Sequence, residues 1–314
     1  MTIASETELP ASSPALVLDH AAVTREFERG PHRYLAGPHG RIAYWSFGHG
    51  PDVVCVHGWP LSGATFRGLI PPLAQHFRLH VFDLPGSGFT EWSGPVGFEE
   101  HAETVATAIA ALDLGRYALL GHDSGGLIAR IVATRDARVC GLVLGNTELP
   151  GHHSPMIGAL VAVAKMPGGI AAIGALMRVG AIRRSPLGFG GCFRDKSLID
   201  GEFGRLFVAP LIRSPEVARA QWRTLLDADF SINDRIDAIH AALGVPVRNI
   251  WGTDDPFFPL AKARAMLRGL PKGSDLVEIA GGKLFVHEEY PQEFALHTRA
   301  FLSNLRWQAD LSAC

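Results

Sequence analysis

Cysteine is scarce and scattered in this chain of 314 residues, which has only four. Cys55, Cys140, Cys192 and Cys314 match no metal-ligand spacing, and two of them fall in apparent buried strands. This pattern argues against a disulfide framework and a zinc site, and it is typical of reduced thiols in a cytoplasmic protein. We therefore expect no metal and no cofactor.

An excess of charge of either sign is also missing. The chain has 29 Lys and Arg residues and 31 Asp and Glu residues, a net charge of −2, and both signs are spread along it. Because there is no basic stripe, the sequence predicts neither a nucleic acid nor a membrane as partner. We expect a monomer or a homodimer that binds a small hydrophobic substrate.

Apolar runs long enough to cross a bilayer are absent as well. The most apolar stretch, Ser154 to Ala181, is divided by Lys165, Arg178 and the breaker Pro167-Gly168-Gly169 into runs shorter than the ~20 residues that a bilayer requires. We interpret it as a lid or core element. The first thirty residues lack the features of a signal peptide and are expected to form a loose arm.

Short β-branched runs alternate with helical patterns over most of the chain, and this alternation predicts an α/β fold with a mostly parallel central sheet and helices on both faces. The helix with the clearest periodicity is expected over Glu99–Leu114. The expected strands are His32–Leu35, Arg41–Phe47, Val53–His57, Leu79–Asp83, Ala118–Gly121, Gly141–Asn146, Val247–Trp251 and Leu276–Ile279.

The alternation stops between Leu149 and Ala242, where the sequence is helical and rich in Ala, Gly and Leu. We expect an arm over 1–30, a first core segment over 31–148, a helical cap over 149–242 and a second core segment over 243–314. Such an insertion is expected to lie over the carboxyl ends of the strands, where the active site of an open α/β sheet forms.

The most informative stretch is Leu119–Gly126. An apolar strand runs into Asp123, which has Gly121 and Gly125 two residues before and after it, and a helical pattern follows. This is the pattern of a nucleophile elbow, a turn so sharp that its central residue is strained and presents its side chain above the sheet. A Cβ at either glycine would collide with the neighbouring backbone.

Ser124 is the alternative nucleophile. Its neighbours at the same two offsets are His122 and Gly126, so only one of them is small, and we favour Asp123. A carboxylate that attacks carbon forms an alkyl ester, which suits the opening of an epoxide or the displacement of a halide better than acyl transfer.

Three further motifs follow the expected strands. They are Pro51–Pro60, which contains His-Gly-Trp-Pro, then Asp83–Gly88, and far downstream Val247–Pro256. With the elbow, they make the chain resemble the α/β-hydrolase superfamily, and most closely its branch with an aspartate nucleophile: epoxide hydrolases, haloalkane dehalogenases and fluoroacetate dehalogenases. The resemblance covers residues 32–148 and 240–305 and implies the α/β-hydrolase fold with an inserted helical cap.

The resemblance implies that the backbone N–H groups of Trp59 and Ser124 stabilise developing negative charge. The indole N–H of Trp59 is a further candidate donor, to a leaving halide or an epoxide oxygen. His57 and His122 match positions that brace the loop and the elbow.

The acid of the family's triad matches Asp255, in the sequence Trp-Gly-Thr-Asp-Asp-Pro, with Asp254 as the reserve. Glu148 is a second candidate, because some dehalogenases take their acid from the loop after the preceding strand. Such an acid orients the histidine that activates water against the ester.

The histidine is where this chain departs from the pattern. The family has Gly-Gly-His after its last strand, whereas this chain has Gly-Gly-Lys at Lys283, and the nearest histidine is His287. We favour a loop whose register brings His287 to the site. The alternatives are a site with no base, or different chemistry that uses Lys283.

The substrate is less defined than the reaction. Epoxide hydrolases have tyrosines in the cap, but all four tyrosines here lie outside it. Haloalkane dehalogenases have tryptophan after the nucleophile, where this chain has Ser124. Fluoroacetate dehalogenases have arginines where this chain has Ser124 and Leu127, and Arg130 lies too far along the helix. Three hypotheses stay open: an epoxide or organohalide hydrolase, an esterase, lactonase or lyase with a different triad, and a ligand-binding member without catalysis.

Overall fold

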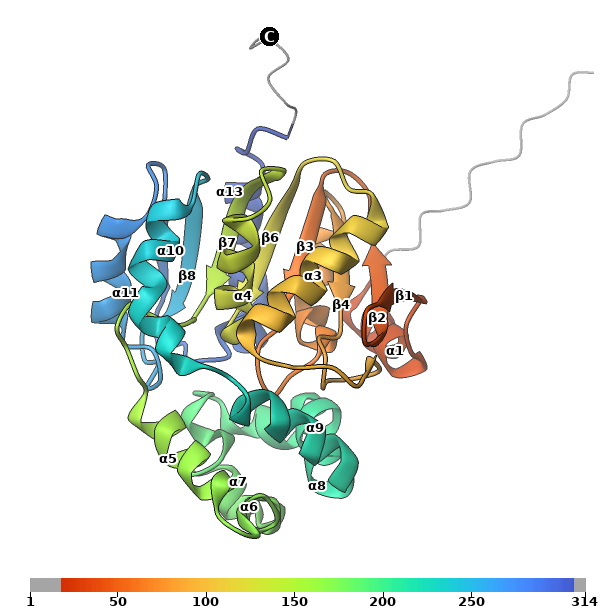
Figure 1. The fold of residues 1–314 in the computed structure, drawn as a ribbon, viewed down its shortest axis with the longest axis vertical. Helices are drawn as coiled ribbons and strands as arrows, with labels where there is room; N and C mark the ends of the chain where they lie inside the picture. The colour runs from red at the N-terminus through yellow and green to blue at the C-terminus, as the bar shows by residue number, and fades with distance from the viewer. Residues whose placement is uncertain (1–17, 308–314) are drawn as a thin grey trace, which may run out of the picture.

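A nine-stranded sheet forms the centre of the molecule, in the order β1-β2-β4-β3-β6-β7-β8-β9, with β5 paired to β2 (Figure 1). The computed structural model describes residues 18–307. β1 and β5 pair antiparallel with β2, as β2 does with β4, and all other pairs are parallel. The strands are β1 Arg33–Gly37, β2 Gly40–Phe47, β3 Asp52–Val56, β4 Arg78–Phe82, β5 Glu91–Trp92, β6 Tyr117–His122, β7 Val139–Gly145, β8 Val247–Gly252 and β9 Asp275–Ile279.

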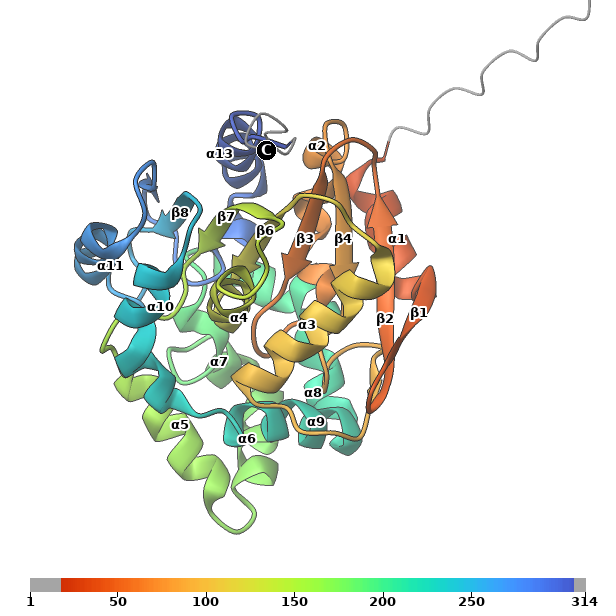
Figure 2. The same ribbon diagram turned by 45° about the horizontal axis from the view of Figure 1, so that its top comes forward.

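Helices cover both faces of this sheet, and each face has its own buried apolar cluster. Side chains of α3, α4 and α10 pack on one face, and those of α1, α2, α11 and α13 on the other (Figure 2). These helices are α1 His20–Arg29, α2 Ile70–Leu73, α3 Phe98–Leu112, α4 Ser124–Ala133, α10 Ile236–Ala242, α11 Leu260–Met266 and α13 Pro291–Leu302, with the short α12 Val286–Glu289 before the last. The eight expected strands and the expected helix are confirmed, with ends that differ by at most two residues, and β5 was not expected.

The remaining helices form a layer beyond the carboxyl ends of the parallel strands (Figure 1). They are α5 Pro155–Lys165, α6 Gly169–Arg178, α7 Gly180–Arg183, α8 Ala209–Arg213 and α9 Pro215–Leu226. Trp222 and Leu225 of α9 pack with Ala164 of α5 in a third apolar cluster, which Trp59 of the core joins. The expected cap, 149–242, also includes α10, although α10 packs on the core helix α4.

The N-terminal segment does not behave as a loose arm over the part that the structure describes. Residues 1–17 lie outside the described part, but residues 20–29 form α1, whose Val23 and Phe27 are buried in the core. Asp19 caps this helix by accepting a hydrogen bond from the N–H of Ala22 at 2.7 Å. The expectation of a loose arm is wrong here because α1 is amphipathic and covers apolar side chains of the sheet.

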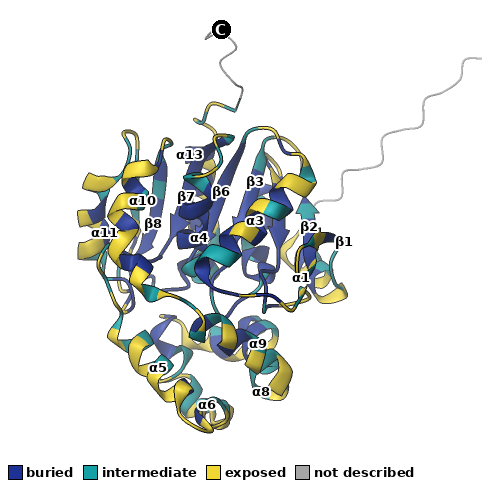
Figure 3. Ribbon diagram, in the orientation of Figure 1, coloured by how far each residue is buried: buried dark blue, intermediate teal, exposed yellow. Residues whose placement is uncertain are grey.

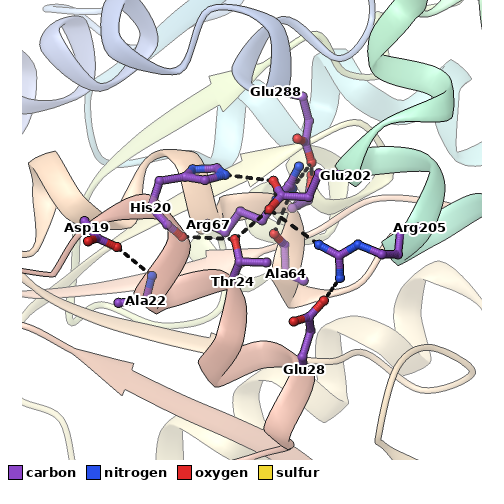
Figure 4. A network of polar contacts seen from close by, with 11 residues as sticks. Asp19, His20, Ala22, Thr24, Glu28, Ala64, Arg67, Glu202, Arg205 and Glu288 are labelled. Carbon is purple, nitrogen blue, oxygen red and sulfur yellow. Dashed lines mark hydrogen bonds and ion pairs between the residues drawn. The ribbon is translucent and has the colours of Figure 1, made fainter.

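A buried ionic network joins α1, the core and the cap (Figure 4). Arg67 is 4% exposed, and its guanidinium donates to Glu202 Oε2 at 2.6 Å and to Glu288 Oε1 at 2.8 Å. Thr24 of α1 donates to the other oxygen of Glu202 at 2.9 Å. Because removal of one partner would leave a buried charge uncompensated, this network fixes the cap segment around Glu202 against the core.

The apolar stretch of the cap contains the described helices that most resemble membrane spans. No single helix among residues 18–307 is long and apolar enough to span a membrane. α5 and α6 reach that length and composition only as a pair, and the pair is bent by 115°.

Truncation of Phe27 tests the packing of α1. Phe27 is 3% exposed, and its ring centroid lies 5.0 Å from that of Trp45 and 5.6 Å from that of Phe47. Phe27→Ala should lower the free energy of unfolding by about 3 kcal/mol, measured by urea denaturation. Arg25→Ala on the exposed face of the same helix should change it by less than about 0.5 kcal/mol. Equal effects of both substitutions would contradict this packing.

Candidate active site

The backbone is most strained where β6 meets α4, at Asp123. This residue has φ 53° and ψ −138°, a conformation that L side chains rarely adopt, and α4 begins at the next residue. A Cβ at Gly121 would lie 2.6 Å from the carbonyl oxygen of Gly125, and a Cβ at Gly125 would overlap carbonyl oxygens at the end of β3. The elbow read from the sequence is therefore present, and it is centred on Asp123 rather than on Ser124.

The carboxylate of Asp123 lies against the loop after β3. The backbone N–H of Trp59 donates to Asp123 Oδ2 at 3.0 Å and also lies 3.1 Å from Ser124 Oγ. Burial raises the pKa of Asp123 well above its usual range, and the charge of Glu148 raises it further, whereas the N–H groups of Ser124 and Trp59 lower it. The N–H groups that favour the carboxylate are those that the resemblance assigned to charge stabilisation.

Glu148 is the second acid of the site. It is 4% exposed and lines the same cavity as Asp123, and burial raises the pKa of its carboxyl. Thr147 Oγ1 lies 2.8 Å from Glu148 Oε2 and 2.8 Å from the carbonyl oxygen of Asp123. Arg130 donates to the same Thr147 Oγ1 at 2.9 Å. The hydroxyl has one proton for two acceptors. All of these contacts are satisfied when Glu148 is protonated and donates to Thr147, while Thr147 donates to Asp123.

Arg130 lies behind this acid rather than in the cavity. It is fully buried on α4, and its Nη2 donates to the carbonyl oxygen of Glu148 at 2.9 Å as well as to Thr147. Burial lowers its pKa to about 10, so it stays cationic at neutral pH. The sequence correctly placed it too far along the helix to hold a substrate, but it did not indicate that Arg130 holds the backbone that carries Glu148.

Asp255 is the buried acid of the loop after β8. Asn146 Nδ2 donates to its Oδ2 at 2.6 Å and the N–H of Phe257 donates to its Oδ1 at 2.7 Å. Burial raises the pKa of Asp255 to about 6 against these hydrogen bonds. The reserve candidate Asp254 is exposed and accepts from the hydroxyl of Thr253 at 3.0 Å.

The structure does not bring His287 to the cavity, contrary to the prediction. His287 is 1% exposed on α12, its Nε2 is hydrogen-bonded to Thr65 Oγ1 at 2.7 Å, and its ring centroid lies 4.0 Å from that of His122. Burial lowers its pKa well below the usual range, so the imidazole is neutral. The short helix α12 turns this side chain into the core, where Thr65 is hydrogen-bonded both to His287 and to Glu288, a partner of Arg67.

Lys283, at the family's histidine position, is half-buried, and its positive charge lowers the pKa of Asp255. The position therefore lies near the acid, as the resemblance implies, but it carries an ammonium group. A lysine is a base near neutrality only when burial lowers its pKa.

The indole of Trp59 and the imidazoles of His57 and His122 are the remaining candidates, and each hydrogen-bonds within the protein. The indole N–H of Trp59 donates to the carbonyl oxygen of Gln221 at 2.8 Å, so it joins core to cap instead of pointing to a leaving group. His57 Nε2 accepts from the N–H of Leu84 at 2.9 Å, and His122 Nε2 is hydrogen-bonded to the carbonyl oxygen of Leu284 at 2.7 Å. Burial lowers the pKa of both histidines to about 4, which suits neutral structural roles.

A cavity of about 760 Å³ separates the elbow from the cap. Asp123, Ser124 and Glu148 line its floor, and mostly apolar side chains of α5, α6 and α9 line its opposite wall. Among the described residues that line it, the imidazoles are those of His152 and His153. A space of this size is typical of a site for a large apolar ligand oriented by a few polar groups.

Sequence reasoning missed the amide and hydroxyl that organise the acids. Asn146 bridges two strand ends, because its Oδ1 accepts from the N–H of Gly252 at 2.8 Å while its Nδ2 donates to Asp255. Asn146 and Thr147 follow β7 directly. Polar residues at the carboxyl end of a parallel strand are the signal by which the sequence could have identified them.

Comparison with known proteins agrees with this fold. Residues 51–170 match a family model described as the alpha/beta hydrolase fold. The solved structure of epoxide hydrolase CorEH has a TM-score of 0.72 at 20% identity over 86% of this chain and 98% of that chain. An alpha/beta hydrolase fold protein from Burkholderia ambifaria has a TM-score of 0.70 at 22% identity, over 85% and 96%. The chain has the α/β-hydrolase fold.

The curated relatives match over only part of the chain. A pimeloyl-(acyl-carrier protein) methyl ester esterase from Aeromonas hydrophila is 41% identical over 87 residues, which are 28% of this chain and 34% of that protein. Haloalkane dehalogenase 2 from Mycobacterium bovis is 37% identical over 118 residues, 37% of this chain and 41% of that protein. The chain thus spans less than half the length of these relatives in either match.

The close packing under the elbow is tested at Gly125. A Cβ at this position would overlap the carbonyl oxygens of Val56 and His57, which are backbone atoms and cannot rotate away. Gly125→Ala should therefore lower the midpoint of thermal unfolding by several degrees or prevent folding, measured by circular dichroism. Gly158→Ala, on α5 with open space around the added Cβ, is the matched control and should not lower it. A Gly125→Ala protein as stable as this control would show that the elbow is not so tightly packed.

Proposed function

We propose that this protein is a hydrolase of the aspartate-nucleophile branch that opens an epoxide on a large apolar molecule through an Asp123 alkyl ester. One observation carries the proposal: the strained carboxylate of Asp123 and the carboxyl of Glu148 lie in one apolar cavity, and the negative charge of Glu148 raises the pKa of Asp123, so that the pair retains one proton. When that one proton is on Glu148, the pair supplies a carboxylate nucleophile and a proton donor at the same pH.

In the first step, an oxygen of Asp123 forms a bond to an epoxide carbon and the carbon–oxygen bond of the ring breaks. The released oxygen takes the proton of Glu148, which leaves Glu148 as a carboxylate. Asp123 Oδ2, which accepts from the N–H of Trp59, becomes the carbonyl oxygen of the ester.

In the second step, water attacks the carbonyl carbon of the ester and loses a proton to the Glu148 carboxylate. The N–H groups of Trp59 and Ser124 stabilise the negative charge on the carbonyl oxygen. The bond between the carbonyl carbon and the substrate oxygen then breaks, and that oxygen takes the proton of the newly added hydroxyl. The diol leaves, Asp123 is again a carboxylate, and Glu148 is again protonated. In this proposal Glu148 replaces the histidine as the proton carrier, because the imidazole of His287 lies in the core.

Two contacts favour an epoxide over an organohalide. The indole of Trp59 is occupied by Gln221, so it does not serve a departing halide. A departing epoxide oxygen requires a proton, and the hydrogen bonds around Thr147 favour a protonated Glu148. The cap has no tyrosine to supply that proton, which is consistent with an acid from the core.

Trapping of the ester tests the nucleophile. After brief exposure to a panel of apolar epoxides, the intact protein should gain the mass of one substrate, and Asp123→Asn should gain none and lose turnover. In a single turnover in heavy-oxygen water, label should enter Asp123 before it enters the product, because the ester is cleaved at its carbonyl carbon.

Ser124→Ala is the matched control and should keep the adduct. If it is the inactive variant, with hydrolysis of aryl esters by the native protein, the chain is an acyl hydrolase. Binding of these compounds with no adduct in any variant would instead indicate a ligand-binding protein.

The pH dependence of alkylation tests the coupling between the two acids. Attack requires the Asp123 carboxylate, so the rate of adduct formation with an alkyl halide, which needs no proton donor, should rise with pH through the pKa of Asp123. Because the negative charge of Glu148 raises that pKa, Glu148→Gln should move the rise to lower pH.

Glu148→Gln should also let the ester accumulate, since loss of a general base typically slows such a step by about 10²–10⁴-fold. Asp254→Asn, which removes an exposed acid nearby, should leave the profile in place. A rise at the same pH in wild type and Glu148→Gln would refute the coupling.

A further inference from the structure

Exposed large apolar side chains are concentrated on one part of the cap. Of the seven large apolar side chains that are strongly exposed in the described chain, five lie between residues 163 and 187. They are Val163, Met166, Leu176, Val179 and Leu187, with exposures of 43%, 62%, 49%, 49% and 83%. We call these five residues the lid face. Such a concentration of exposed apolar side chains in one segment, in contrast to exposed single residues scattered over the surface, indicates an interaction surface.

The lid face lies in a segment that carries one sign of charge. Between Glu148 and Asp195 the sequence contains no Asp or Glu but five cations, Lys165, Arg178, Arg183, Arg184 and Arg194. Arg183 and Arg184 pair with Asp200. Lys165 and Arg178 are exposed and form no ion pair within residues 18–307. The net charge of −2 for the whole chain hides this local excess.

The lid face also adjoins the cavity. Met166, Arg178 and Leu187 line the cavity as well as the surface, so the cavity reaches solvent beside the exposed apolar side chains. The helices α5 and α6 lie on the far side of the cap from the sheet, and they are largely exposed (Figure 3). No other element of the described chain covers these side chains.

We propose that the lid face docks on an anionic lipid surface. Exposed apolar side chains next to cations are the two contributions that hold a protein in a bilayer interface, because the apolar groups enter the acyl boundary and the cations meet the headgroups. The inference is independent of the proposed function, since it concerns binding and not catalysis. It revises the expectation of no membrane partner, which rested on charge averaged over the chain.

A second copy of the chain fits this surface less well. In a twofold interface the same patch meets itself, so Lys165 and Arg178 of both copies would lie in one interface, with no acidic residue in the segment to compensate. An anionic lipid surface satisfies both the apolar and the charged groups.

Vesicle co-sedimentation with the full chain tests the proposal. The protein should sediment with vesicles of phosphatidylcholine and phosphatidylglycerol, and more weakly with phosphatidylcholine alone or in high salt. Met166→Glu combined with Leu187→Glu should abolish the binding. Lys165→Gln and Arg178→Gln should weaken it by about fivefold each, the usual contribution of a cation near such a surface.

Gln292→Glu combined with Leu296→Glu is the matched control. Both residues are exposed on α13, at the opposite end of the molecule from α6, and the change in net charge is the same (Figure 1). Circular dichroism should show that all variants are folded, because every substituted side chain is exposed.

Three results would overturn the proposal. The first is no sedimentation of the wild type with anionic vesicles, and the second is equal loss of binding in the control variant. The third is a wild-type dimer in analytical ultracentrifugation that the Met166→Glu, Leu187→Glu variant dissociates, which would assign the lid face to a second copy. Because these measurements need no substrate, their outcome does not depend on whether the proposed Asp123 chemistry is correct.

Discussion

The close approach of three backbone segments at the carboxyl end of the sheet is the constraint on which the site depends. β3, the elbow and β7 meet with no room for a side chain at Gly121, Gly125 or Gly126. This contact holds Asp123 at φ 53°, so its carboxylate stands beside the N–H of Trp59 without further movement. The strain is maintained by packing of the surrounding elements, which is how such conformations persist in folded proteins.

The second constraint is the burial of charge beside this contact. Asp123, Glu148 and Asp255 all have pKa values raised by burial, and one buried cation, Arg130, lies behind them. Three carboxylates cannot all be ionised in such a space at little cost. Two polar residues contact different members of this group. The amide of Asn146 donates to Asp255, whereas the hydroxyl of Thr147 contacts the carboxyl of Glu148 and the backbone carbonyl oxygen of Asp123. In the proposed mechanism, the proton that this group retains is the one that passes to the epoxide oxygen, in a cavity whose walls are mostly apolar.

The local pattern of the sequence was sufficient for the sheet and for the elbow. Strands of β-branched residues, the two glycines around Asp123 and the Gly-x-x-Asp motif at Asp255 all depend on neighbours a few residues away, and each was found where it was expected. His287 was misplaced because its position depends on α12, a four-residue helix whose direction is set by contacts with Thr65 and Phe66, more than two hundred residues earlier. Contacts between residues so far apart in the chain cannot be predicted from a local sequence pattern.

The cap shows the same limit in another form. Its apolar stretch is ambiguous in sequence, because a core helix, a lid and a membrane-surface helix share one composition. The fold separates these possibilities by giving α5 and α6 two sides, one that faces the cavity above Asp123 and one that faces solvent. Apolar groups on the inner side are explained by an apolar ligand. A ligand in the cavity does not explain the apolar groups on the outer side. Folding alone does not favour the exposure of these groups to solvent next to unpaired cations. The proposed anionic lipid surface accounts for both properties of the outer side, because it complements a segment that has no acidic residue from Leu149 to Arg194.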